Sequence, residues 1–267
     1  MTGCPQYYKR RFEYTGPENG GPALKQITVF IGNSGSGKTE LAINFALSYA
    51  ERGSTQLIDL DLLNPYFRLS ERRETVQNAG IDLVAPNNAS GNVESMSLSP
   101  RVNSAFDFKR DNVIFDVGGD PAGTMAIGRY RRKFEEFTGR LEVLYTVNIR
   151  RPMTDTREKI ISLMTRLQEV SGLGFTGLVN NANLAGETTP VDLFEGYEIL
   201  RRVSEETGVL TAYTTGCRQV LEEFLKREPD KRFVGMPKEI KIYMHRDWHN
   251  FTETLKGSKK TNGQDNC

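Results

Sequence analysis

Eight consecutive residues near the start of the chain have the types and the spacing of a phosphate cradle. They are Gly32, Asn33, Ser34, Gly35, Ser36, Gly37, Lys38 and Thr39, and they match the pattern G-x-x-x-x-G-K-[ST]. In that pattern the glycines let backbone N–H groups turn toward a β-phosphate, the lysine reaches β- and γ-phosphate oxygens, and the Thr39 hydroxyl is a ligand for Mg²⁺. The sequence therefore predicts nucleotide binding by this loop, with Glu40 directly behind it.

The segments on either side of the loop are the ones that such a cradle needs. Residues 27–31 form an apolar run that predicts a strand, and residues 41–49 carry apolar side chains at helical spacing. A helix that begins at Lys38 would direct the positive end of its dipole at the same anion. Strand, glycine loop and helix in this order favour a nucleotide site over an ordinary glycine-rich turn.

A second apolar run, residues 112–117, predicts a strand that carries Asp116 near its end and is followed by Gly118 and Gly119. In an open parallel sheet, ligands bind beyond the carboxyl ends of the strands. We expect Asp116 to hold Mg²⁺ through water while Thr39 binds it directly. The backbone of Gly119 is expected to meet the γ-phosphate and to respond to its loss.

Two further aspartates close the strand predicted over residues 55–60. Asp59 and Asp61 flank one residue, so extended backbone would direct both carboxylates to the same side. Such a pair suits one outer-sphere contact to Mg²⁺ and one group that positions an attacking water. The sequence leaves open which aspartate has which role.

Asparagines follow a later strand, predicted over residues 175–180. Asn180, Asn181 and Asn183 stand where many nucleotide-binding proteins of this type recognise the base. A guanine site would read N-K-x-D, and here Asn181 takes the place of the lysine and Asn183 that of the aspartate, which argues for ATP over GTP. An asparagine amide can pair with the N6/N7 edge of adenine.

The rest of the chain continues the alternation of strands and helices without a repeat or a clear linker. This pattern predicts an α/β protein with three layers, in which helices flank a mostly parallel sheet of about seven strands. We expect an N-terminal arm or edge strand (residues 1–26), one nucleotide-binding domain (residues 27–250) and a polar C-terminal tail (residues 251–267).

Composition argues against several classes of function. The 35 Lys and Arg balance 34 Asp and Glu, so no strong field favours nucleic acid or an anionic membrane. No apolar run approaches the ~20 residues of a membrane span, and no apolar signal segment opens the chain, so we expect a cytoplasmic protein. Cys4, Cys217 and Cys267 form no C-x-x-C pair. His245 and His249 lack a third nearby ligand and are expected to pack or to face solvent.

Four motifs together resemble one family. The segments GNSGSGKT, LIDLDLLNP, VIFDVGGDPAG and GLVNNANL occur in this order over about residues 27–215. They are similar to the deviant Walker A P-loop ATPases (MinD, ParA and the CobQ/CobB and Mrp types), and NPYFR, GRY and NNANLAGETT favour a little-characterised subgroup. The resemblance implies a P-loop NTPase fold, MgATP as ligand, an unknown protein client and a dimer that sandwiches two nucleotides.

The chain departs from this family at Asn33, which occupies the position of the signature lysine that reaches the partner's phosphates. Arg68 and Arg129 are the candidates to replace that lysine. Three functions follow as hypotheses: a slow ATPase switch, a P-loop kinase or ligase that phosphorylates a small molecule, and a nucleotide-binding module without turnover. In the second, residues 85–110 and 129–133 would form the lid and the acceptor site.

Overall fold

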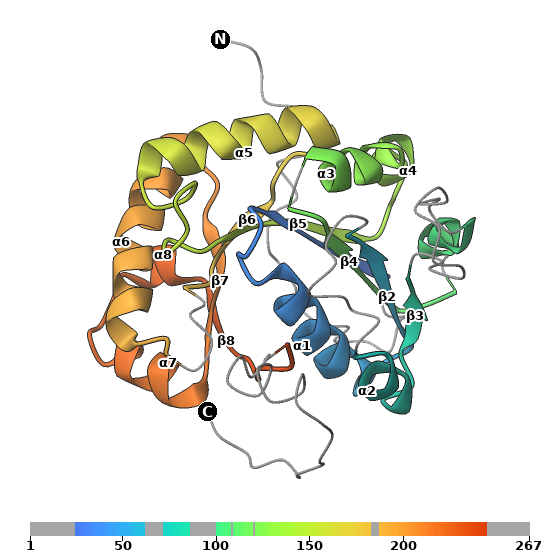
Figure 1. Cartoon of the computed structure of the whole chain (residues 1–267), viewed down its shortest axis with the longest axis horizontal. Coiled ribbons are helices and arrows are strands. Elements are labelled where there is room, and N and C mark those ends of the chain that lie inside the picture. The colour runs from blue at the N-terminus through green and yellow to red at the C-terminus, as the bar shows by residue number, and fades with distance from the viewer. Residues whose placement is uncertain are drawn as a thin grey trace, which may run out of the picture.

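A single parallel sheet of eight strands forms the centre of the molecule (Figure 1). The computed structural model describes residues 25–61, 72–85, 100–107, 109–119, 121–182 and 187–244, without the side chains of residues 121 and 122. The sheet order is β3-β2-β4-β1-β5-β6-β7-β8, and every pairing is parallel. The strands are β1 (Gln26–Gly32), β2 (Thr55–Leu60), β3 (Asp82–Val84), β4 (Asn112–Val117), β5 (Arg140–Val147), β6 (Gly177–Asn180), β7 (Thr211–Gly216) and β8 (Met236–Glu239).

Helices cover both faces of this sheet, and the two faces have separate hydrophobic cores. One face packs against α1 and α2, and the other packs against a larger set that includes α3, α4 and α5 (Figure 1). The elements are α1 (Lys38–Ala50), α2 (Arg73–Asn78), the 3₁₀ helix η3 (Pro100–Phe106), α3 (Pro121–Gly128), α4 (Arg131–Glu135), α5 (Arg157–Ser171), α6 (Pro190–Thr207), α7 (Arg218–Leu225) and α8 (Lys231–Val234).

Strand β1 lies at the point where the chain changes direction across the sheet. The chain leaves β1 through α1 toward β2 and β3, returns to β4 beside β1, and then crosses to β5 on the other side. Strands β1, β4 and β5 are mostly buried and rich in apolar residues, as expected for a parallel sheet that is covered on both faces. Ligands bind at such switch points, beyond the carboxyl ends of the strands.

The three-layer α/β fold with a parallel sheet, predicted from the sequence, is confirmed. Strand β2 coincides with the predicted residues 55–60, whereas β8 was not predicted. Helices α3 and α4 are short and are separated by residues 129 and 130. The N-cap of α5 is Thr156, whose hydroxyl accepts the N–H of Lys159.

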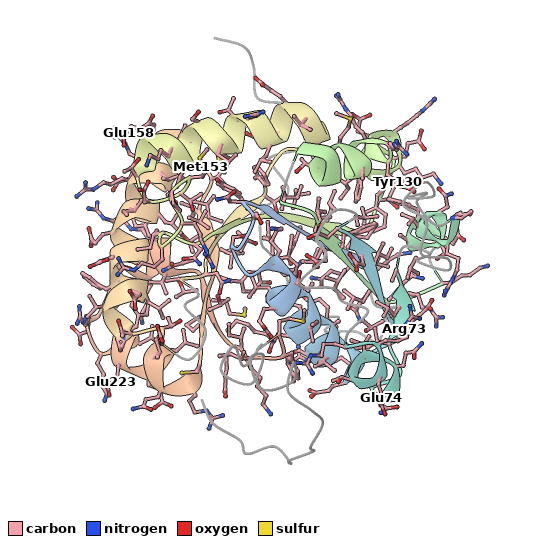
Figure 2. All side chains as sticks on the ribbon, viewed as in Figure 1. Arg73, Glu74, Tyr130, Met153, Glu158 and Glu223 are labelled. Atoms are coloured by element: carbon pink, nitrogen blue, oxygen red, sulfur yellow. The ribbon has the colours of Figure 1, made fainter. Side chains whose placement is uncertain are left out.

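The predicted arm and tail fall almost wholly outside the described residues. Strand β1 includes Gln26, which the prediction had assigned to the arm. The domain boundaries stay predictions. In the part of the chain that the structure describes, the search for a helix with the length and hydropathy of a membrane span found none. Charged side chains such as Glu158 and Glu223 lie at the periphery (Figure 2).

Candidate functional site

The loop between β1 and α1 has the backbone of an anion cradle. Gly35 and Gly37 have φ angles of 72° and 87°, in the left-handed region that only glycine adopts at little cost. Gly37 is the N-cap of α1, and no side chain caps this helix. The first N–H groups of a helix have no acceptor within it, so they are the natural donors to a phosphate.

Lys38 lies inside this loop rather than in solvent. Its side chain is buried, and Nζ donates a hydrogen bond to the carbonyl oxygen of Asn33 at 2.9 Å. The same carbonyl accepts the N–H of Ser36, and the Asn33 side-chain oxygen accepts the N–H of Ser34 at 2.9 Å. Asn33 therefore stabilises the conformation of its own loop, and its carbonyl fixes the position of the Lys38 ammonium.

Two asparagines that follow distant strands support the loop by donating hydrogen bonds to its backbone carbonyls. Asn181 donates from Nδ2 to the Ser36 carbonyl at 2.7 Å, and its Oδ1 accepts the Thr215 hydroxyl at 2.7 Å. Asn148 donates from Nδ2 to the Gly35 carbonyl at 3.4 Å. The shape of the loop thus depends on residues that follow β5 and β6, and on Thr215 within β7.

We expect Asn181→Ala to lower the free energy of unfolding by about 1–3 kcal/mol, because the buried Ser36 carbonyl and Thr215 hydroxyl would each lose a hydrogen-bond partner. Urea unfolding measures this change. Asn78→Ala, on the exposed end of α2, is the control and is expected to leave stability unchanged. Equal stability of the two variants would contradict the bracing role.

Asp116 stands in β4 directly beside β1, opposite Phe30, and is also the register partner of Asp59 in β2. It is 1% exposed, and neither carboxylate oxygen has a hydrogen-bond partner among the described residues. Burial raises the pKa of Asp116 to about 7, an effect that the nearby Thr39 hydroxyl and Lys38 ammonium oppose. Asp116 is therefore a buried acid whose charge is opposed by burial and favoured by Thr39 and Lys38 of the adjacent loop.

These groups fit a Mg²⁺ ion. The Thr39 hydroxyl and the unpartnered Asp116 oxygens are hard oxygen donors, the type that Mg²⁺ prefers. Asp59 lies at the same end of the sheet, and its Oδ1 accepts the N–H of Asp61 at 2.9 Å. The negative charge of Asp61 raises the pKa of Asp116, so these two carboxylates lie near one another.

Gly119 touches the loop itself. A Cβ added to Gly119 would lie 2.5 Å from the backbone nitrogen of Ser34 and 2.7 Å from its Cα. No side chain fits there without displacing backbone. The segment after β4 and the phosphate loop are therefore in direct contact, as the predicted role of Gly119 requires.

The structure gives Asn180 and Asn181 roles other than the predicted contact with a base. Asn181 uses both ends of its amide on Ser36 and Thr215, and Asn180 donates from Nδ2 to the Leu193 carbonyl at 3.0 Å. Both residues are 1% exposed, and Oδ1 of Asn180 has no hydrogen-bond partner among the described residues. The contact with a base stays a prediction. Asn183 lies outside the described residues.

Glu40 is likewise directed away from the loop. Its carboxylate accepts the backbone N–H groups of Tyr243 and Met244, while Asn44, one turn later in α1, exchanges two hydrogen bonds with the backbone of Lys241. Burial raises the pKa of Glu40, and the two N–H groups act in the opposite direction. The predicted nucleotide contact of Glu40 is replaced, for the side chain, by an anchor for residues 241–244.

Of the two candidates for the missing lysine, Arg129 alone belongs to the described residues. Arg68 lies outside the described residues. Arg129 is exposed and follows α3, and no hydrogen bond or ion pair with another described residue involves it. Figure 2 labels its neighbour Tyr130, which lies near α3 and α4.

Sequence reasoning missed the arginine that does contact the loop. Arg151 donates from Nε to the Gly35 carbonyl at 3.0 Å. Arg151 lies four residues beyond the end of β5. That position could have indicated a role at the loop, because residues at the carboxyl ends of parallel strands share one edge of the sheet. The pairing itself joins residues 116 positions apart and leaves no local signal.

The histidine pair at 245 and 249 lies outside the described residues, as do Cys4 and Cys267. Cys217 is a partly buried free thiol. Within the ranges that the structure describes, no group of three or more His, Cys, Asp or Glu residues is arranged to hold a metal.

Comparison with known proteins shows the fold. No protein-family model matches the chain, and no curated protein matches it. Among solved structures, cell division protein FtsY from Thermotoga maritima aligns with a TM-score of 0.50 and 16% identity over 75% of this chain and 64% of that chain. FtsY from Mycoplasma mycoides gives 0.46 and 15% over 72% and 59%. The BceF tyrosine kinase domain gives 0.36 and 22% over 57% and 66%.

The alignment spans less than two thirds of the length of both FtsY chains. At 16% identity, the likeness to Thermotoga maritima FtsY shows the architecture and no activity. It does not single out the MinD/ParA subgroup, which stays a prediction from the motifs. The chain has the α/β fold of the P-loop NTPases, with one parallel sheet flanked by helices.

Proposed function

We propose that this protein binds MgATP and hydrolyses it slowly, as a switch that acts on a protein client. The observation that carries the proposal is the unpartnered, buried Asp116 carboxylate beside the glycine loop and Lys38. A buried carboxylate without a partner is unfavourable unless a cation or donor meets it. A Mg²⁺ ion would supply the positive charge that faces Asp116, and the nucleotide phosphates would supply the negative charge that faces Lys38 and the loop.

In this proposal the loop N–H groups and Lys38 bind the phosphates, and Thr39 and Asp116 hold the metal. When bound, Mg²⁺ would neutralise the charge that develops on the β- and γ-phosphate oxygens. The backbone of Gly119 contacts the loop at Ser34. Loss of the γ-phosphate would therefore change the conformation of the segment before α3.

The two remaining acids have separate roles in the proposal. Asp59 is buried, lies beside Asp116 in the sheet and is tied to the N–H of Asp61, which suits an outer-sphere contact to the metal. Asp61 follows the strand and is only partly buried, so it can reach solvent. We assign to Asp61 the positioning of the attacking water.

ATP is favoured over GTP because the segment after β6 lacks the lysine and aspartate of N-K-x-D. Phosphate release from MgATP and MgGTP, with chain mass recorded by size exclusion in each state, tests the proposal. We expect slow release from MgATP that Lys38→Ala abolishes, and a shift to dimer mass with ATP. Binding without turnover in a persistent monomer, or transfer of phosphate to a small-molecule acceptor, would contradict the switch.

A further inference from the structure

Arg151 is fixed against the phosphate loop by its own turn. Its side chain donates from Nε to the Gly35 carbonyl at 3.0 Å. Its backbone N–H donates to the Asn148 carbonyl at 3.1 Å, and its own carbonyl accepts the N–H of Thr154 at 2.9 Å. The Thr154 hydroxyl closes the same turn by donating to the Asn148 carbonyl at 2.6 Å. The guanidinium is therefore placed by a compact turn whose ends, Asn148 and Thr154, are buried.

The charge of Arg151 is not neutralised within the described part of the chain. No carboxylate there lies within ion-pair distance of it, and its two terminal amino groups donate no hydrogen bond to a described residue. The preceding Arg150 differs, because it pairs with Asp192 at 2.5 Å and Glu195 at 2.6 Å. Of these two neighbouring arginines, one stabilises the fold and the other places a spare cation beside an anion cradle.

The order of the strands indicates which part of a nucleotide Arg151 would meet. Strand β1 lies between β4, which carries Asp116, and β5, which leads to Arg151. The metal acids thus stand on one side of the loop and Arg151 on the other. Mg²⁺ binds β- and γ-phosphate oxygens, so the α-phosphate and the nucleoside extend away from it.

We propose that Arg151 binds the α-phosphate side of the nucleotide, a role that rests on the proposed function. A guanidinium offers several donors in a plane that fits phosphate oxygens, and Nε is already held by Gly35. The contact is made equally with ATP and ADP, because both carry the α-phosphate. It adds affinity without acting on the phosphate that is transferred.

Equilibrium titration of the full chain with MgATP and MgADP tests this assignment, with Arg151→Gln, Arg151→Lys and Arg166→Gln as variants. Arg166 is exposed on α5 and joins no described residue by hydrogen bond or ion pair, so it is the matched control. We expect Arg151→Gln to weaken both ligands by about tenfold or more. Arg151→Lys should recover part of this loss. In Arg151→Gln the KM for MgATP should rise, while kcat and the urea midpoint should stay as in the wild type.

Other results overturn the assignment. Unchanged affinities in Arg151→Gln would show that the arginine is idle. A loss confined to MgATP, or a fall in kcat at unchanged KM, would place the contact at the terminal phosphate. If the wild-type chain binds neither nucleotide, the proposed function fails as well, whereas failure in Arg151→Gln alone leaves that function standing.

Discussion

Replacement of Lys38 by alanine is expected to weaken MgATP binding by about a hundredfold, the largest effect of any single substitution at the loop. The Lys38 ammonium is buried and lies within 2.9 Å of the Asn33 carbonyl, so it is held at the mouth of the cradle before any ligand arrives. Its charge-assisted bonds to phosphate cost little further ordering. Isothermal titration with MgATP measures the loss.

The control for this variant is Lys231→Ala. Lys231 opens α8 and is exposed, so its loss is expected to leave binding unchanged. Urea unfolding of both variants separates a loss of binding from a loss of fold. A Lys38→Ala protein that is folded and binds MgATP like the wild type would refute the assignment of the loop.

Asp116→Asn is expected to change stability and activity in opposite directions. At pH 8 the ligand-free variant should gain about 1–3 kcal/mol in free energy of unfolding, because it removes a buried charge whose desolvation outweighs the effects of Lys38 and Thr39. Mg²⁺-dependent turnover should fall by at least about a hundredfold, since the neutral amide holds the metal poorly. Denaturant unfolding and a Mg²⁺ titration of phosphate release measure the two effects.

Asp155→Asn provides the comparison, because Asp155 is exposed and pairs with Lys159 at 2.7 Å on the surface. This exposed pair is screened by solvent and is expected to contribute little to stability, and its loss should leave the Mg²⁺ dependence intact. If Asp116→Asn lost stability instead, Asp116 would be a satisfied structural group. Unaltered Mg²⁺ dependence would remove it from the metal site.

The parts of the fold that local sequence dictates were predictable. Strand β2 and the switch from β1 to α1 follow from apolar runs bounded by glycines and acids, and β2 matches its predicted limits. Strand β8 was missed because Met236–Glu239 is short, mostly exposed and contains Pro237. Its place in the sheet comes from pairing with β7, which no local pattern announces.

The candidate site divides in the same way. The loop residues and Asp116 are recognisable because their chemistry requires fixed types at fixed spacing. The bracing by Asn181 and the contact of Arg151 are long-range, since they join residues 145 and 116 positions from their partners. The Asn-rich segment was interpreted as a base site because it follows a strand, whereas burial directs its amides into the protein.

The anchor at Glu40 is a further long-range feature. A carboxylate one residue after Thr39 fixes residues 243 and 244, so the C-terminal part of the described chain is attached to the first turn of α1. Sequence patterns show that Glu40 follows the loop. They do not show what it binds.

Equilibrium binding of nucleotide to the purified wild-type chain tests the central claim most directly. MgATP, MgGTP and a Mg²⁺-free ATP sample are titrated in parallel, with fold verified by circular dichroism. The account predicts saturable binding of ATP that is tighter with Mg²⁺ than without it, and weaker binding of GTP. A folded chain that binds none of the three would contradict it.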